Sequence, residues 1–320
     1  MSKICPMCEC STVLLADQVH VADLVAGYKS RFDLNVTQYL QIDQVPKLEL
    51  LYCPECDFKW FFPVLAADGN FYENIQKNSW YYQTEKVEFD FTLKSLSQGD
   101  RVLEIGCGAG FFGSILPDGI VYKGLEFNEL AVSTGQARSI DIELESIESH
   151  AAKHPARYDL VCSFQVLEHV TDPRQFLESC AEAVKAGGTL VIGVPAENSF
   201  LSIAENNWLN MPPHHLSRWT DKALVCAFES LGLQDIHIWH EPIDEVTRPW
   251  HEDCLANFGL KTLLGVKPKL VSDRLLSRAV WNLPKTSIAR RWLINHGRSR
   301  FSYADHGHTV CISGQRPVES

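Results

Sequence analysis

The sequence predicts an α/β protein built on a doubly wound, mostly parallel sheet. From residue 100 onward, apolar runs of strand length alternate with stretches of helical character, an order that is typical of βαβ units. The first run, 102–105, leads directly into the glycine-rich loop "GCGAG" (106–110). The second run ends in Glu126, twenty positions after Gly106. Because the carboxyl ends of parallel strands share one edge of the sheet, we expect the loop and this carboxylate to lie side by side.

Six strands and three helices are expected in this part of the chain. The apolar runs predict strands at 102–105, 121–127, 159–164, 189–194, 234–240 and 309–314. One helix is expected over 130–138. A second begins at Asp172 and Pro173, a capping residue followed by a proline that suits the first helical turn, and it ends before Gly187. Thr220 caps a third helix.

Composition divides the chain into three parts. Residues 1–68 hold two cysteine pairs and predict a small zinc-ribbon module, and residues 69–97 predict an aromatic-rich helical connector. Residues 98–320 are expected to form the α/β domain, with a helical insert at about 245–305 before the last strand. The aromatic residues of the connector, Trp80, Tyr81 and Tyr82, are expected to pack in the core. The arginines of the insert are expected to lie on a solvated helix face, and they are Arg290, Arg291, Arg298 and Arg300.

The charge and hydropathy of the chain exclude several classes of function. The formal net charge is -11 and the acidic residues are spread along the sequence, so a long nucleic acid would be repelled and a small-molecule partner is expected instead. No apolar run reaches the roughly 18 residues of a membrane span, and the first residues lack the apolar stretch of a signal peptide. We therefore expect a cytoplasmic protein without a membrane partner, and the sequence predicts no oligomeric state.

Two cysteine pairs have the spacing of metal knuckles. The eleven cysteines follow no export signal, so they are expected to stay reduced. Cys5 pairs with Cys8 and Cys53 with Cys56 in two C-P-x-C segments. Four thiolates arranged in this way bind Zn²⁺ in a closed tetrahedral site that serves structure rather than catalysis. The alternative is a set of buried or redox-active thiols, and Cys10 is a spare cysteine in either case.

Two carboxylates beside the glycine loop predict the chemistry of its ligand. Glu126 can accept hydrogen bonds from both hydroxyls of a ribose. Glu104, at the end of the first strand, would repel a diphosphate but can pair with an ammonium group. A nucleoside that carries an amino acid satisfies both carboxylates.

A dinucleotide is the competing ligand for this loop. Gly108, Gly110 and Gly113 satisfy the G-x-G-x-x-G fingerprint, but they begin two residues beyond the expected end of the strand. When the motif is counted from Gly106, its third position is the bulky Phe111. The sequence therefore favours the nucleoside over the dinucleotide.

At this point the sequence resembles the class I S-adenosylmethionine-dependent methyltransferases, which have a Rossmann-like fold. The resemblance covers about residues 75–240 and four ordered segments, "VLEIGCGAG", the strand ending in Glu126, "YDLVCSFQVLEHVTDP" and "AGGTLVIGVP". It implies that the glycine loop lines the methionine part of S-adenosylmethionine, that Glu126 holds the ribose, that residues 145–147 lie near the adenine and that Gln165 faces the sulfonium. The full set of expected cofactor-binding residues is Glu104, Gly106, Cys107, Gly108, Gly110, Glu126, Phe127, Ser146, Ile147 and Gln165.

Three histidines are candidates for deprotonating the methyl acceptor. An imidazole takes up a proton near neutral pH. His169 directly follows the strand at 159–164, and His214 and His215 lie in "NMPPHHLSRWT" (210–220), beyond the next strand. This stretch resembles a Pro-Pro-His-His segment of methyltransferases that act on sugars and other small metabolites. We expect His215 to be the general base and His214 or His169 to position the substrate. The alternative role of His214 and His215 is hydrogen bonding within the loop, and that of His169 is helix capping or packing.

Three functions follow from these expectations. The first is in-line methyl transfer to a small metabolite, such as a nucleotide-linked sugar, because the cysteine module resembles the start of bacterial methyltransferases of sugar and surface-polysaccharide pathways. The second is methylation of ribosomal RNA, with the zinc ribbon recognising the RNA; the acidic charge counts against it. The third is a non-catalytic adaptor that binds S-adenosylmethionine.

Overall fold

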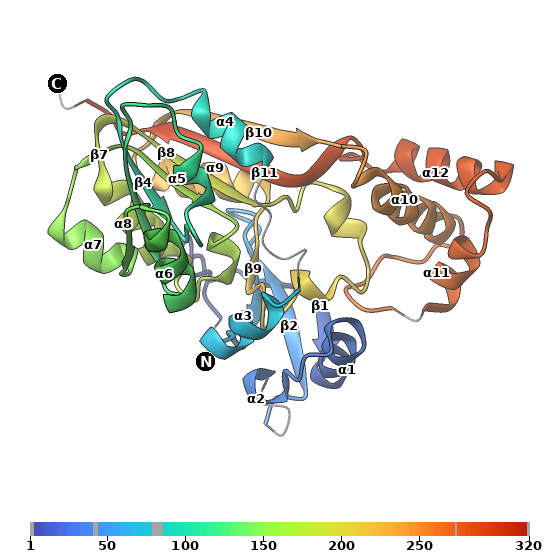
Figure 1. Cartoon of the computed structure of the whole chain (residues 1–320). Helices are drawn as coiled ribbons and strands as arrows, with labels where there is room; N and C mark the ends of the chain where they lie inside the picture. Colours follow the sequence, from blue (N-terminus) through green and yellow to red (C-terminus); the bar gives the residue numbers. More distant parts are fainter. Residues whose placement is uncertain (1–2, 41–43, 79–85, 273, 319–320) are drawn as a thin grey trace.

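The computed structural model describes residues 3–40, 44–78, 86–272 and 274–318. The chain forms a seven-stranded sheet and a smaller four-stranded sheet, and a group of helices projects from one end (Figure 1). The aromatic residues Trp80, Tyr81 and Tyr82, which the sequence predicts to pack in the core, lie outside the described residues.

The seven-stranded sheet confirms the expected doubly wound fold class. Its strand order is β10-β11-β8-β7-β4-β5-β6, and the strands from β6 to β8 are parallel, whereas β11 is antiparallel to both of its neighbours. The strands are β4 (Arg101–Ile105), β5 (Val121–Glu126), β6 (Ile142–Leu144), β7 (Tyr158–Phe164), β8 (Val184–Pro195), β10 (Gln234–Pro242) and β11 (His306–Gln315). The chain reverses its direction of progress across the sheet between β4 and β7, the position at which doubly wound sheets bind their ligands.

Helices cover both faces of this sheet. On one face, Phe176 and Phe228 pack with strand residues such as Ile192, and on the other, Phe89 and Phe112 pack with Val191 and its neighbours. The helices around the sheet are α4 (Val87–Leu93), α5 (Phe111–Ser114), α6 (Glu129–Ala137), α7 (Ile147–Lys153), α8 (Pro173–Ala183) and α9 (Asp221–Ser230). Asp172 and Thr220 cap α8 and α9 as expected, each accepting a hydrogen bond from the first helical turn.

Each of the six expected strands is present, and the structure adds one to the seven-stranded sheet. The additional strand, β6, is only three residues long and is buried at one position. A segment this short has too few residues to show the alternation that reveals a strand. Strand β8 begins at Val184, before Gly187 and Gly188. Its pairing with β7 is irregular there, since Val184 pairs with Tyr158 and the next pair is Thr189 with Leu160, and Gly187 has a φ angle of 74°.

The smaller sheet joins the amino-terminal residues to the α/β domain. Its order is β1-β2-β3-β9 and all three pairings are antiparallel. It consists of β1 (Leu14–His20), β2 (Lys47–Tyr52), β3 (Lys59–Phe62) and the two-residue β9 (Ser217–Arg218), with helices α1 (Val21–Phe32), α2 (Thr37–Leu40) and α3 (Gly69–Ile75) alongside. Because β9 belongs to the long segment after β8, the two parts of the chain share backbone hydrogen bonds.

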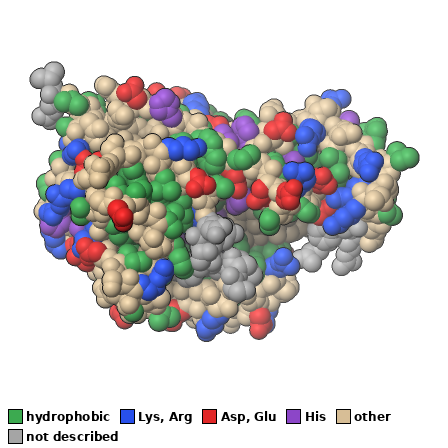
Figure 2. Space-filling view, turned by 45° about the horizontal axis from the view of Figure 1, so that its top comes forward, with side chains coloured by type: hydrophobic (Ala, Val, Ile, Leu, Met, Phe, Trp, Pro, Cys, Tyr) green, Lys and Arg blue, Asp and Glu red, His purple; other side chains and the backbone are tan. Residues whose placement is uncertain are grey.

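The expected helical insert contains three helices, α10 (Arg248–Leu263), α11 (Arg274–Trp281) and α12 (Ile288–Arg300). Helices α10 and α12 approach closely, since a Cβ atom added at Gly259 or Gly297 would lie 2.2 Å from a backbone oxygen of the other helix. Lys and Arg side chains are frequent at this end of the molecule, and acidic side chains gather between it and the α/β body (Figure 2). Among the described residues, no helix is long and apolar enough to cross a membrane.

Candidate functional site

The loop after β4 has little side-chain bulk and a left-handed backbone. Gly106, Gly108 and Gly110 have φ angles of 70°, 53° and 74°, values at which glycine avoids the steric cost that other residues incur. A side chain at Gly106 would also clash, because its Cβ atom would lie 2.3 Å from Cγ2 of Val166. Cys107 is buried among them. The loop therefore forms a tight turn of main chain at the carboxyl end of β4.

The carboxylate of Glu126 lies against this turn. Its Oε2 accepts a hydrogen bond of 2.8 Å from the backbone N–H of Gly108. Its Oε1 accepts hydrogen bonds from the N–H groups of Phe127 and Asn128, at 2.7 and 2.9 Å. The two loops that follow β4 and β5 are thus joined by one carboxylate, as the parallel topology predicts.

The second carboxylate, Glu104, lies below the turn in the core of the sheet. It is 4% exposed, and Tyr122 donates a hydrogen bond of 2.6 Å to its Oε2. Burial raises the pKa of Glu104 to about 8, against the hydrogen bond from Tyr122, which lowers it. The free site therefore holds a carboxyl group that a positively charged ligand would ionise.

The loop after β6 places its residues in different environments. Ser146 caps α7 and its Oγ accepts a hydrogen bond of 3.1 Å from the N–H of Ser149. Ile147 is 2% exposed, so only its main chain faces the loop. By contrast, the side chain of Phe127, after β5, is 73% exposed and offers an aromatic face at the same edge of the sheet.

Gln165 directly follows β7 and has a left-handed conformation, with a φ angle of 60°. Its backbone N–H donates to the carbonyl of Gly193 at 2.8 Å, and its Nε2 donates to Oε1 of Glu88 at 3.0 Å. Glu88 lies in α4 and is 3% exposed. The positive φ angle of a residue other than glycine is a strained feature held by these two contacts, and it directs the chain from β7 into the histidine-bearing turn.

The structure brings the three expected histidines together. His169 ends the short 3₁₀ helix η1 (Leu167–His169), which follows β7, and His214 and His215 precede β9. The imidazole centroid of His169 lies 4.5 Å from that of His214 and 4.8 Å from that of His215. The rings of His214 and His215 are stacked with centroids 4.5 Å apart. We call these three residues the histidine cluster.

Hydrogen bonds fix the orientation of each imidazole. The Nδ1 atom of His169 lies 2.7 Å from the carbonyl oxygen of His214, and Nδ1 of His214 lies 2.9 Å from that of Leu209. Nδ1 of His215 lies 3.0 Å from Oδ1 of Asn210. Because carbonyl and amide oxygens only accept hydrogen bonds, each Nδ1 carries the proton, and in the neutral ring Nε2 then has a lone pair.

Glu168 is the buried carboxyl group of this region. It is 1% exposed, and its Oε1 lies 3.7 Å from Nε2 of His169 and 3.9 Å from Nε2 of His215. Neither of its oxygens has a hydrogen-bond partner among the described residues. Burial raises the pKa of Glu168 to about 8 and lowers the pKa of His169 to about 4. Burial also lowers the pKa of His215 well below its ordinary value.

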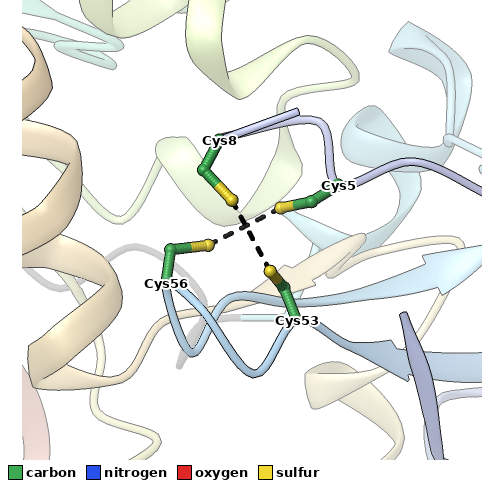
Figure 3. Close-up of side chains that lie close together, drawn as sticks. All are labelled: Cys5, Cys8, Cys53 and Cys56. Carbon is green, nitrogen blue, oxygen red and sulfur yellow. Dashed lines mark hydrogen bonds between the residues drawn. The ribbon is translucent and has the colours of Figure 1, made fainter. Parts of the chain in front are cut away.

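The four paired cysteines converge on one point (Figure 3). The Sγ atoms of Cys5 and Cys56 are 3.6 Å apart, and those of Cys8 and Cys53 are 3.5 Å apart. Thiolates bound to one Zn²⁺ at about 2.3 Å lie roughly 3.8 Å apart, so these spacings fit a tetrahedral zinc site. The hydrogen bond from Cys56 lowers the pKa of Cys5 to about 5.

Comparison with known proteins identifies the α/β domain. Residues 75–238, more than half of the chain, match a family model described as "Methyltransferase domain". The chain belongs to this family. Its domain is accordingly a class I S-adenosylmethionine-dependent methyltransferase domain, and the matched residues contain the glycine loop, both flanking carboxylates and the histidine cluster.

Curated relatives match a shorter part of the methyltransferase domain. The ubiquinone biosynthesis O-methyltransferases of Klebsiella pneumoniae and Salmonella arizonae are 36% and 40% identical over 97 residues, which is 28% of this chain and 40% of each relative. The chain thus aligns with less than half the length of these relatives. A solved S-adenosylmethionine-dependent methyltransferase of Archaeoglobus fulgidus is 18% identical, covers 76% of this chain and 99% of its own, and has a TM-score of 0.53. This similarity shows the common fold.

Three functional candidates of the methyltransferase were not assigned a role from sequence. Glu168 is buried without a hydrogen-bond partner in the described part of the chain, Asn210 orients His215, and the ring of Tyr72 lies 5.8 Å from that of His169. The position of Glu168 beside His169 in "LEHV" is the only sequence signal among them. Asn210 and Tyr72 are separated from their partners in the chain, so the fold is needed to bring them together.

Proposed function

We propose that this methyltransferase transfers the methyl group of S-adenosylmethionine to a small metabolite that binds against the histidine cluster. The observation that supports the proposal most is the contact between its two halves. Val166, which lies three positions before His169, contacts Gly106 of the glycine loop. A cofactor at that loop and an acceptor at the histidines would therefore be neighbours at one edge of the sheet.

The cofactor supplies a methyl group that is already activated by a sulfonium centre. The protein has to hold the cofactor and orient the acceptor for in-line attack. Glu104 would face the ammonium group and Glu126 the ribose hydroxyls. The remaining cofactor-binding residues of the proposal are Gly106, Cys107, Gly108, Gly110, Phe127, Ser146, Ile147 and Gln165.

His215 is the proposed general base for the acceptor. In its neutral form the Nε2 lone pair can take the proton of a hydroxyl group, and His169 and His214 would position the substrate. A nucleotide-linked sugar is our first acceptor class, because its hydroxyls need only positioning and deprotonation. The relatives' names refer to O-methylation, which supports an oxygen acceptor.

The cysteine cluster is proposed to bind a structural Zn²⁺. The donor set consists of four sulfurs at spacings that suit a tetrahedral ion. Four protein ligands leave no open position, so the proposal assigns the metal no role in the reaction.

Measurement of S-adenosylhomocysteine formation with a panel of hydroxylated metabolites tests this function. His215→Gln should lower turnover by about 10²- to 10⁴-fold while calorimetric affinity for S-adenosylmethionine is retained. His154→Gln, at a half-buried histidine that follows α7 and lies outside the histidine cluster, is the matched control and should leave turnover unchanged. Full turnover in His215→Gln would remove this residue from the mechanism, and cofactor binding without turnover on any acceptor would favour the adaptor.

A further inference from the structure

Nitrogen and oxygen atoms with lone pairs converge in the histidine cluster. Each of its three residues offers one ring nitrogen, and these nitrogens lie within 4.8 Å of one another. Glu168 adds a carboxylate oxygen at 3.7 Å and 3.9 Å from two Nε2 atoms. The four residues come from two segments, the turn after β7 and the loop before β9, that the fold brings to one place.

The hydrogen bonds show that Glu168 does not accept a hydrogen bond from the ring N–H groups of His169 and His215. A carboxylate beside imidazoles is usually satisfied by a ring N–H. Here the Nδ1 atoms of His169 and His215 face carbonyl and amide oxygens, so their protons point away from Glu168. The carboxyl group instead faces Nε2 lone pairs, and it has no hydrogen-bond partner among the described residues. An unpaired carboxyl group that is 1% exposed is costly unless a positively charged partner lies beside it.

We propose that the histidine cluster and Glu168 bind a divalent transition-metal cation. Ligands at about 2.1 Å on neighbouring corners of a tetrahedron lie roughly 3.4 Å apart, so the observed separations require small inward movements of the side chains. The oxygens that hold the Nδ1 atoms are the kind of outer partner that orients metal-binding imidazoles. Three imidazoles and a carboxylate suit zinc, manganese, iron or cobalt rather than calcium.

A second group of potential metal ligands differs from the histidine cluster, because the carboxylate at its centre already has partners. Glu143, Glu145 and His150 also lie within range of one ion. Glu145, however, is paired with Lys153 and accepts a hydrogen bond of 2.8 Å from Ser149. Glu145 therefore already has partners, whereas neither oxygen of Glu168 has a hydrogen-bond partner among the described residues.

The cation site would narrow the class of acceptor in the proposed methyl transfer, and this part of the inference rests on the proposed function. A cation held beside the glycine loop would bind an acceptor through a hydroxyl oxygen, which defines the substrates as molecules with an oxygen ligand near the methylated atom. With the cation bound, Nε2 of His215 would be one of its ligands and the cation would acidify the acceptor hydroxyl; His215 would act as the general base proposed above only in the metal-free protein. Cation binding itself does not depend on whether the acceptor has been identified.

Metal stoichiometry of the full-length protein tests the site. After saturation with Zn²⁺ and dialysis, wild type should retain two metal equivalents by mass spectrometry, one at the cysteines and one at the histidine cluster. The double variant His214→Ala and His215→Ala, and separately Glu168→Gln, should retain only the cysteine-bound equivalent, while His154→Gln should keep both. Retention of that first equivalent shows that each variant is folded.

Cobalt substitution gives an independent readout. Cobalt at the cysteine cluster should show intense thiolate charge-transfer absorption, and cobalt at the histidine cluster should add weaker visible bands that Glu168→Gln alters and His154→Gln does not. Equal metal content and equal spectra in wild type and Glu168→Gln would overturn the site. Loss of S-adenosylmethionine binding in wild type would instead contradict the proposed function, and the two failures are thereby distinguished.

Discussion

At the scale of single residues, the buried Glu104 is an unusual carboxyl group because its ordinary pKa of 4.5 is raised to about 8 by burial. Tyr122 provides its one described hydrogen bond. A folded pKa above the unfolded value means that the folded protein binds the proton more tightly than the unfolded chain. This residue therefore lowers the stability of the ligand-free protein progressively as the pH rises from about 4.5 to about 8, and the loss is complete above that window.

Replacement of Glu104 by Gln should separate stability from cofactor binding. The variant lacks the ionisable group, so its ligand-free form should be more stable than wild type at pH values above about 8. Its affinity for S-adenosylmethionine should fall, because an amide carries no charge to pair with the ammonium group. Thermal unfolding across the pH range and calorimetry measure the two effects. An unchanged affinity would show that Glu104 does not contact the cofactor.

Within the glycine loop, a side chain at Gly106 should lower stability and cofactor affinity the most. Its φ angle of 70° costs roughly 1–2 kcal/mol for other residues, and a Cβ atom would lie 2.3 Å from Val166. We expect Gly106→Ala to lower the melting temperature and to weaken cofactor binding at least tenfold. Gly69→Ala is the matched control, since a Cβ atom at Gly69 meets nothing within 4 Å. Wild-type binding by Gly106→Ala would contradict the role of this turn.

At the scale of secondary-structure elements, β9 links the cysteine cluster to the histidine cluster. Strand β3 follows the Cys53 and Cys56 knuckle and pairs with β9. The carbonyl of Leu216 accepts a hydrogen bond of 2.9 Å from Phe61 in β3, while the N–H of Leu216 donates to the carbonyl of Glu168 at 2.8 Å. One residue next to His215 is thus held by both parts of the chain.

Loss of the knuckle should therefore loosen the histidine loop. In Cys53→Ser with Cys56→Ser, backbone hydrogen exchange should increase at residues 53–62 and at residues 210–219, whereas exchange at β4 and β5 should change little. Mass spectrometry of peptides after deuterium labelling measures this pattern, and Cys10→Ser is the control at the spare cysteine. Unchanged exchange at 210–219 would show that the metal site does not support the loop.

Regular elements with a hydrophobic repeat could be predicted from sequence, and elements defined by long-range pairing could not. The six strands expected after residue 100 are present because each is an apolar run long enough to show its character. Strand β9 has two residues and exists only because β3 lies beside it. In the site, His169 and His214 could be predicted as candidate functional residues from their residue type. The orientation of their rings could not be predicted, because it depends on carbonyl groups that no motif reveals.

At the scale of the whole molecule, the methyltransferase domain carries two additions, the four-stranded sheet along one side and the helical insert at one end (Figure 1). The insert is anchored by the buried pair of Lys261 and Glu205, and it lies beyond the strands that carry the cofactor loop. The proposed cofactor site therefore lies within the α/β body, and its affinity should be a property of the β4 and β5 loops.

Calorimetric titration of the ligand-free protein with S-adenosylmethionine tests this central claim most directly. Wild type should bind one equivalent, and Glu126→Ala should bind at least tenfold more weakly, because it lacks the carboxylate that joins the loops and would hold the ribose. The His154→Gln control should bind as wild type does. Absence of binding by folded wild-type protein, or equal affinity in Glu126→Ala, would contradict the account.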